Sequence, residues 1–355
     1  MAFCPFNQTA NIPSNPSNQT AGMSSLNYFT ISLHGLFSSI GIIENLLILG
    51  VVGFRVRHSV ISIWILNLAA SDLLATSSLP FFTLYMARGN TWTLGTTFCR
   101  IHSSIFFLNM FVSGFLLAAI SMDRCLVVLR PIWAQNHRSI QIVSKVCGVI
   151  WALAVVCTIP FYIFRDTLTQ PNGKVLCYYN YARLLSGEQN AETLKALCRH
   201  RKVALAFMKL FLAFLIPLLI IILSYVAVNA NLARRGCRRP LRFVRLVIAV
   251  VVSFILCWAP YHFFIVMEVM ASLGTVQTFA SKALPVAATI GFLNSVLNPI
   301  LYVFSCPDLC SKIRHSLGAV MESVLTEDLA YLARRRSTAR SISTTEVVLK
   351  QRDSI

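Results

Sequence analysis

The sequence has few charged residues for its length. Only 12% of its 355 residues are Asp, Glu, Lys or Arg, whereas 56% are hydrophobic. A soluble domain carries roughly 25% charged residues, so these side chains could not cover an ordinary water-facing surface. The shortage of charge excludes a typical soluble protein and predicts that much apolar surface meets lipid.

Basic residues are absent from the first apolar stretch and from everything before it. The first Lys or Arg is Arg55, directly after that stretch, and Arg57 follows it. Residues 1–27 are polar and rich in Asn, Pro and Ser, unlike a cleaved signal peptide, so we expect the first span to direct its own insertion. Because basic loops stay in the cytoplasm, the N-terminus is predicted to be extracellular.

Seven apolar stretches reach the roughly 20 residues that a helix needs to cross a bilayer. They cover residues 28–54, 60–87, 99–129, 141–164, 202–232, 241–270 and 278–304. An odd number of spans places the C-terminus in the cytoplasm. The glycosylation sequons at Asn7 and Asn18 then lie outside, and the arginine-rich segment 234–245 lies inside. The net charge of +18 fits contact with anionic membrane lipids better than contact with nucleic acid.

The chain therefore divides into four parts. Residues 1–27 form an extracellular glycosylated tail, and 28–304 form the bundle. Residues 305–325 repeat apolar side chains at helical spacing, which predicts a short amphipathic eighth helix on the membrane surface. Residues 326–355 are polar and predict a disordered cytoplasmic tail.

Several features of other membrane proteins and of enzymes are missing. No Cys-x-x-Cys spacing suggests a metal site, and no lysine lies in 283–306, where a retinal protein needs one. Repeated halves, which are common in transporters, are not evident. Since no catalytic constellation is present either, we do not expect an enzyme.

Ionisable residues within a span are costly and suggest function. Asp72 lies in the middle of the second span. Ser113, Asn294 and Asn298 could supply further oxygen ligands to a sodium ion held by this carboxylate. The alternative is a water-filled hydrogen-bond network without a specific ion. We expect no other cofactor.

The third span ends with Asp123 and Arg124, which could pair in one state and separate in another, as a switch requires. The alternative is a pair of side chains that merely reach the interface. Pro217, Pro260 and Pro299 interrupt the last three spans and predict hinges, because proline removes a backbone hydrogen bond.

Together these positions form a recognisable pattern. The chain resembles the rhodopsin-like G-protein-coupled receptors over about residues 28–325. The matching positions are Asn45, Leu68 to Asp72, Asp123-Arg124, Trp151, Pro217, Tyr225, Cys257-Trp258-Ala259-Pro260 and Asn298-Pro299-Ile300-Leu301-Tyr302. The resemblance implies a seven-transmembrane helix bundle that couples to a heterotrimeric G protein. Cys125 replaces the usual tyrosine after Arg124, and no acidic residue stands at the start of the sixth span, so the resting state is expected to be held less tightly.

Longer segments are similar to the chemoattractant-type prostaglandin D2 receptors, a subfamily of leukocyte chemoattractant receptors. These segments are residues 103–110, 130–137, 164–167 and 177–180. The resemblance implies a lipid-acid ligand such as a prostaglandin, an inhibitory G protein and a role in chemotaxis.

Lys209 fits such a ligand. It lies in the fifth span, eight residues before Pro217, and no acidic residue on the same helix could neutralise it. One interpretation is that the Lys209 side chain extends up to the membrane interface, where its ammonium meets water. The other is an ammonium that waits for a ligand carboxylate, and basic residues exceed acidic ones around the predicted outer mouth, which attracts anions.

Further candidates surround this lysine. Arg165, expected to end the fourth helix, could offer a forked contact to a carboxylate, and Tyr179 and Tyr261 could donate hydrogen bonds to it. The subfamily resemblance implies acid-binding roles at these positions. Phe81, Phe82, Trp92, Phe106 and Trp258 suit a hydrocarbon chain, although packing within the core is the alternative for each. His102 either bonds a ligand oxygen or is a satisfied residue of the pocket wall.

The outer cysteines suggest two disulfides. The resemblance implies that Cys99 pairs with Cys177. Cys4 and Cys198 are the other cysteines predicted to face the oxidising side, and their pairing would fold the N-terminal tail over the pocket.

Coupling is expected at the cytoplasmic side. As the family implies, ligand contact near Trp258 would tilt the sixth helix about Pro260, and Tyr225 and Tyr302 would swing towards Arg124. Candidate sites for receptor kinases, whose phosphates could recruit arrestin, are Ser337, Thr338, Ser341, Ser343, Thr344 and Thr345. The alternative for this tail is an unregulated polar segment.

The sequence thus predicts a plasma-membrane receptor for an anionic lipid mediator. The alternative is a chemoattractant receptor for a peptide or for another carboxylate-bearing ligand.

Overall fold

The computed structural model describes residues 25–54, 58–184, 190–234, 241–271 and 274–305, with only the backbone described for 25–26, 241–248 and 302–305. In chain order the elements are α1 Ser25–Phe54, α2 Val60–Ala87, α3 Gly95–Leu129, α4 Pro131–His137, α5 Ile140–Ile163, β1 Arg165–Thr169, β2 Val175–Tyr179, α6 Ala191–Lys209, the π-helix η1 Leu210–Leu215, α7 Ile216–Arg234, α8 Leu241–Met270 and α9 Gly274–Ser305.

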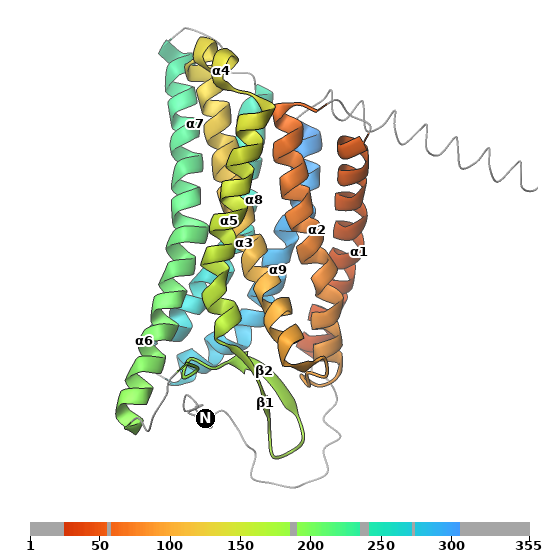
Figure 1. Ribbon diagram of the computed structural model, residues 1–355, viewed down its shortest axis with the longest axis vertical. Coiled ribbons are helices and arrows are strands. Elements are labelled where there is room, and N and C mark those ends of the chain that lie inside the picture. Colours follow the sequence, from red (N-terminus) through yellow and green to blue (C-terminus); the bar gives the residue numbers. More distant parts are fainter. Residues whose placement is uncertain (1–24, 55–57, 185–189, 235–240, 272–273, 306–355) are drawn as a thin grey trace, which may run out of the picture. The chain divides into compact units, whose positions relative to one another are not determined.

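In this part of the chain, seven helices are long and apolar enough to cross a membrane, with α6, η1 and α7 forming one continuous span. They run side by side as a bundle, with α4 at one end and the β1–β2 hairpin at the other (Figure 1). We call the latter the hairpin end. The predicted seven-transmembrane helix bundle is confirmed.

The outward faces of the spans are apolar. On α5, Val149 and Val156 are 66% and 60% exposed, whereas Ala154 and Cys157 on the inner face are buried. A water-facing helix normally places polar side chains on its outer face. The reversed arrangement indicates that lipid covers this side of the bundle.

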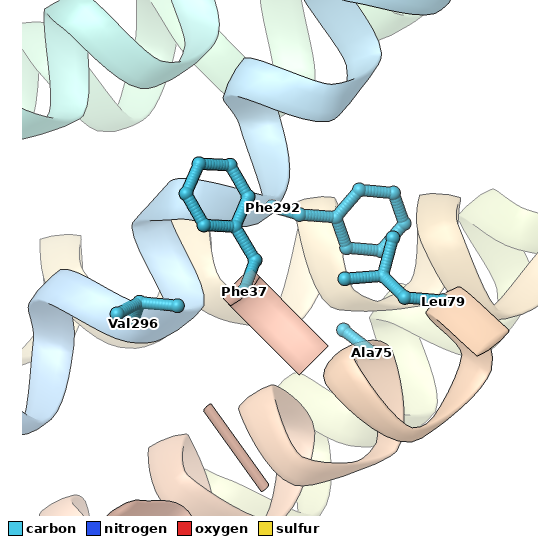
Figure 2. Close-up of a cluster of buried hydrophobic side chains, with 5 residues drawn as sticks. All are labelled: Phe37, Ala75, Leu79, Phe292 and Val296. Carbon is cyan, nitrogen blue, oxygen red and sulfur yellow. The ribbon is translucent and has the colours of Figure 1, made fainter. Parts of the chain in front are cut away.

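A compact apolar cluster joins α1, α2 and α9. Phe37 and Phe292 pack with Ala75, Leu79 and Val296, all of them at most 9% exposed (Figure 2). Burying one large apolar side chain stabilises a fold by about 1.5–3 kcal/mol relative to exposure in water. In a membrane, close packing of this kind supplies much of the attraction between helices.

The hairpin is a feature that hydropathy did not predict. Its strands pair antiparallel, with Arg165 opposite Tyr179 and Thr167 opposite Cys177. Gly173 forms the turn with a φ of +79°, which glycine adopts without steric cost. The segment Pro171-Asn172-Gly173 has the composition of a tight turn.

The fifth span begins earlier than predicted. Hydropathy places its start at residue 202, whereas α6 begins at Ala191. The first turns contain Ala, Leu, Glu and Lys, which favour helix in water as well as in lipid. The helix therefore continues beyond the apolar stretch.

The hinge prolines lie within continuous helices. Pro260 is inside α8 and Pro299 inside α9, and Pro217 follows η1. Other described helices also contain proline, at Pro80 and Pro160, so the distinction that the sequence suggested for the last three spans is weaker than expected. The amphipathic helix of 305–325 and the tail of 326–355 lie outside the described residues, apart from Ser305.

Candidate functional site

Lys209, the last residue of α6, lies inside the bundle. The residue is 4% exposed, and its Nζ donates a hydrogen bond of 3.2 Å to Tyr261 Oη. The rings of Phe107, Phe161 and Tyr261 surround the ammonium, with centroids 5.0, 5.2 and 5.4 Å away. This burial rules out the interfacial position that the sequence left open.

The ammonium has aromatic faces around it in place of a counter-ion. Among the described residues, no acidic side chain forms an ion pair with Lys209. Glu268 on α8 acts on it electrostatically. However, the Glu268 carboxylate already accepts hydrogen bonds of 3.0 Å from Lys202 Nζ and from Ser281 Oγ.

Arg165 reaches the same region from the hairpin. The expectation that it ends the fourth helix was wrong, because α5 stops at Ile163 and Arg165 begins β1. The strand register sets it opposite Tyr179, and its Cζ lies 4.5 Å from that ring's centroid. Its Nε also contacts Cys177 Sγ at 3.3 Å. The hairpin thus fixes a guanidinium against a phenol.

Tyr179 is a hydrogen-bond donor at physiological pH. Burial raises the pKa of its phenol to about 12, and the neighbouring Arg165 opposes this rise only in part. The hydroxyl therefore keeps its proton and can donate to an anion.

Phe107 connects the two cationic groups. Its ring centroid lies 6.4 Å from that of Tyr179 and 5.0 Å from Lys209 Nζ. Arg165 and Tyr179 both act electrostatically on Tyr261. The four residues that the sequence proposed for acid binding are therefore brought into one site.

An aromatic floor lies beside this site. Phe106 packs against Trp258, Tyr261 and Phe292, with ring centroids 5.9, 5.4 and 5.1 Å apart. Trp258 is only 1% exposed. A group that displaces Phe106 would therefore press on this tryptophan in α8.

His102 is part of a second aromatic group. Its Nε2 is 3.0 Å from Ser78 O, and its ring lies 6.3 Å from Phe81 and Phe82 and 5.5 Å from Trp92. One nitrogen is thus engaged by the backbone of α2, as in a satisfied wall residue.

A cavity of about 340 Å³ opens between α1, α2, β2 and α9. Phe82, Tyr85 and Lys282 border it, and Lys209 does not. Its size and partly aromatic lining offer room for an apolar chain beside the second aromatic group.

The opposite end of the bundle holds the predicted switch residues. Asp123 forms a two-point ion pair with Arg138, at 2.8 and 2.9 Å, a partner that the sequence did not suggest. Tyr225 hydrogen-bonds Ser121 and lies within electrostatic range of Arg124. Arg138, the residue that follows α4, therefore holds the carboxylate of Asp123 on α3.

The middle of the bundle holds Asp72, which is fully buried. Its Oδ2 accepts a hydrogen bond of 2.8 Å from Asn298 Nδ2. Its Oδ1 accepts one of 3.0 Å from Asn109 Nδ2 and a longer one of 3.5 Å from Ser113 Oγ. Asn109 was missed in the sequence, although its spacing of four residues from Ser113 put both on one face of the third helix.

The chain matches the family described as 7 transmembrane receptor (rhodopsin family) over residues 44–302. It belongs to this receptor family. This match identifies a receptor, and not an enzyme, a retinal pump or a transporter.

Three curated receptors are similar to this chain over most of its length. It is 50% identical to Prostaglandin D2 receptor 2 of Mus musculus over 344 residues, covering 96% of this chain and 89% of the relative. It is 52% identical to Prostaglandin D2 receptor 2 of Rattus norvegicus over 314 residues, covering 88% and 77%. N-formyl peptide receptor 2 of Homo sapiens is 34% identical over 324 residues, covering 88% and 90%. The receptor is thus closely related to prostaglandin D2 receptor 2, and its chemoattractant relatives agree with a role in chemotaxis.

One of the two disulfides that we expected in the receptor is present. Cys99 at the start of α3 is bonded to Cys177 in β2, which anchors the hairpin over the bundle. Cys198 is disulfide-bonded as well, but Cys4 lies outside the described residues, so that pairing stays a prediction.

Other predicted positions of the receptor also fall outside the described part. They are Asn7 and Asn18, the side chain of Tyr302, and the candidate phosphorylation sites Ser337, Thr338, Ser341, Ser343, Thr344 and Thr345. Asn294 is described, and its buried Nδ2 has no hydrogen-bond partner within the part of the chain that the structure describes.

Sequence reasoning missed part of the lysine cage. Phe107 and Phe161 both face the ammonium, yet no periodic pattern sets them apart from the receptor's many other phenylalanines. Tyr181 was also missed, because it lies in the turn after β2 and no spacing rule predicts its stacking on Tyr179.

Proposed function

We propose that this receptor binds an anionic lipid mediator of the prostaglandin D2 type and signals through inhibitory heterotrimeric G proteins in chemotaxis. The observation that carries the proposal is the Lys209 ammonium, buried in an aromatic cage and hydrogen-bonded only to Tyr261 among the described residues. The names of the rodent relatives support the choice of ligand.

The charge of the site favours a carboxylate. Taking an ammonium out of water costs several kcal/mol unless an anion compensates for it. Aromatic faces and one phenol compensate in part. A ligand carboxylate between Lys209, Arg165 and Tyr179 would supply the missing charge and accept hydrogen bonds from all three.

The remainder of the site favours a hydrocarbon. Phe107 and Phe161 present apolar surface next to the ammonium, and Phe106 packs against Phe107. Each methylene buried there contributes about 0.8 kcal/mol. A fatty acid derivative combines both requirements in one molecule.

A peptide ligand is the second candidate, because N-formyl peptide receptor 2 is among the relatives. A peptide also ends in a carboxylate, which Lys209 could bind. The enclosed aromatic cage around Lys209 favours a slender acyl chain over a bulkier peptide.

Binding of radiolabelled prostaglandin D2 to membranes with wild-type or Lys209→Ala receptor tests the proposal. We expect the affinity of the variant to fall at least about 30-fold, since losing one partner of a buried charge pair costs roughly 2 kcal/mol or more. The methyl ester of the ligand should bind wild type weakly and should be insensitive to the substitution.

Lys195→Ala is the matched control, because it removes an exposed positive charge from the same helix, α6. Its affinity should stay within a few-fold of wild type. Absence of binding to wild type, or equal affinities of wild type and Lys209→Ala, would contradict the proposal. Binding of a formylated peptide in its place would favour the second candidate.

We extend the proposal to the opposite end of the bundle. The basic loop 234–245 and Arg124 are proposed to face an inhibitory G protein, and the phosphorylated tail to bind arrestin. A fall in cyclic AMP after ligand addition would support the choice of G protein. Membrane lipids are the other proposed partner, through the apolar outer faces of the spans.

Asp72, Ser113, Asn294 and Asn298 are proposed to hold an allosteric sodium ion. One carboxylate with hydroxyl and amide oxygens is a set of hard ligands, which suits sodium. We also propose a plasma-membrane location with an extracellular N-terminus, because basic residues gather on the other side.

A further inference from the structure

Tyr181 lies directly after the hairpin and beside the acid-binding residues. Its ring is stacked on that of Tyr179, with centroids 5.6 Å apart and planes inclined by 11°. Tyr181 lies in the turn that follows β2. The stacking, and not a strand register, therefore sets the two phenols side by side as a pair.

The backbone around Tyr181 is held from two directions. Asn180 N donates to Phe164 O at 2.7 Å, which ties the segment to the end of α5. Arg201 on α6 donates from one Nη to Tyr181 O at 2.7 Å and to Arg183 O at 3.1 Å. These bonds fix the direction in which the Tyr181 ring leaves the chain.

The Tyr181 ring is held on its other side as well. Phe164 lies 5.9 Å from it at an inclination of 50°, and the Arg201 Cζ lies 5.3 Å from the Phe164 centroid. Cations and rings thus stack in one continuous row, in the order Arg165, Tyr179, Tyr181, Phe164 and Arg201.

The hydroxyl of Tyr181 belongs to the polar side of the site. It lies within electrostatic range of Tyr179, Glu268 and Arg165, and it acts in turn on Tyr261. Burial, reinforced by Tyr179 and Glu268, raises the pKa of Tyr181 far above its ordinary value. The hydroxyl therefore keeps its proton.

We propose that Tyr181 is a further specificity-determining residue, whose hydroxyl donates a hydrogen bond to the ligand carboxylate beside Arg165 and Tyr179. Arg201 acts on this bond as a positioning residue, through the Tyr181 carbonyl and the Phe164 ring. The inference rests on the proposed function and deepens it. The Tyr181 hydroxyl would add a hydrogen bond that is stronger to a charged carboxylate than to a neutral ligand, and would so favour acids over esters.

The substitution Tyr181→Phe tests this role, because it keeps the stacked ring and removes only the hydroxyl. Binding of prostaglandin D2 and of its methyl ester is measured for wild type and variant. We expect affinity for the acid to fall about tenfold, as for the loss of one hydrogen bond to a charged group. Affinity for the ester should change little.

Tyr178→Phe is the matched control. Tyr178 carries the same hydroxyl on the neighbouring position of β2, which points to the opposite face, and its removal should leave the ratio of acid to ester affinity unchanged. Equal acid affinity of Tyr181→Phe and wild type would overturn the inference and leave the proposed function standing, provided that Lys209→Ala still loses binding. Failure of wild type to bind the acid would overturn both.

Arg201→Gln tests the positioning role. We expect it to lower the ratio of acid to ester affinity several-fold in wild type and to have no further effect in the Tyr181→Phe background, because both changes remove one contact. Arg199→Gln, an exposed change on the same helix, serves as its control. Equal losses of this ratio in both backgrounds would show that Arg201 acts independently of the Tyr181 hydroxyl, and an unchanged ratio in wild type would show no positioning role. Either result would overturn this part.

Discussion

Two charged residues lie buried within the helix bundle of this receptor. Lys209 and Asp72 are both at most 4% exposed, but their surroundings differ. Lys209 has rings and one phenol around it, whereas Asp72 accepts hydrogen bonds from Asn109, Ser113 and Asn298. This difference supports the proposal that Lys209 binds an anionic ligand. The carboxylate of Asp72, in contrast, links α2, α3 and α9 within the bundle.

The Asp72 cluster gives a prediction at this scale. Sodium bound there would favour the packing of α2, α3 and α9 seen in this structure, in which no described acidic residue forms an ion pair with Lys209. We expect sodium chloride to lower agonist affinity roughly fivefold compared with choline chloride of equal strength. Asp72→Asn, which has the same shape and no charge, should abolish the difference. The sodium site would be refuted if the variant kept the effect, or if wild type lacked it.

Elements act by fixing distances that single residues cannot. The register of β1 and β2 places Arg165 opposite Tyr179, and a slip by one residue would turn one of the two side chains to the other face. The disulfide from Cys99 to Cys177 anchors β2 to α3. The geometry of the proposed acid site thus depends on a hairpin of two five-residue strands.

Close contact between α3 and η1 gives a prediction for helix packing. A methyl group added at Gly114 would lie 2.8 Å from the backbone oxygen of Ala213. Since neither backbone can move cheaply, we expect Gly114→Ala to destabilise the receptor by roughly 1–3 kcal/mol, measured as a lower melting temperature in detergent.

Gly148→Ala on α5 is the control for this change, because nothing lies within 4 Å of the added methyl group. Its higher helix propensity, worth up to about 1 kcal/mol, should leave the melting temperature equal or higher. A Gly114→Ala receptor as stable as wild type would mean that α3 and η1 do not pack as described.

At the scale of the whole molecule, the bundle has two different ends. The hairpin end carries the proposed acid site, and the other end carries the ion pair of Asp123 with Arg138. Trp258, packed against Phe106, lies in α8, whose interior contains Pro260. A ligand that moves these rings could thus act on the far end of the same helix.

The orientation of the molecule gives a further prediction. If the N-terminus is extracellular, Asn7 and Asn18 receive glycans, and treatment with a glycosidase should increase gel mobility. The double change Asn7→Gln and Asn18→Gln should abolish that shift. An N-terminal epitope that antibodies reach only after permeabilisation would show the opposite orientation.

The sequence by itself determined the seven spans, because hydropathy is a local property that each stretch of chain carries alone. It also singled out Lys209 as a candidate for binding an acid, since this lysine has no acidic neighbour on its own helix, and that role stays a prediction. The tertiary structure alone decided the hairpin register, the cage of Phe107 and Phe161, and the pairing of Asp123 with Arg138. Each of these joins residues from separate elements, and no local pattern records which distant partner a side chain meets.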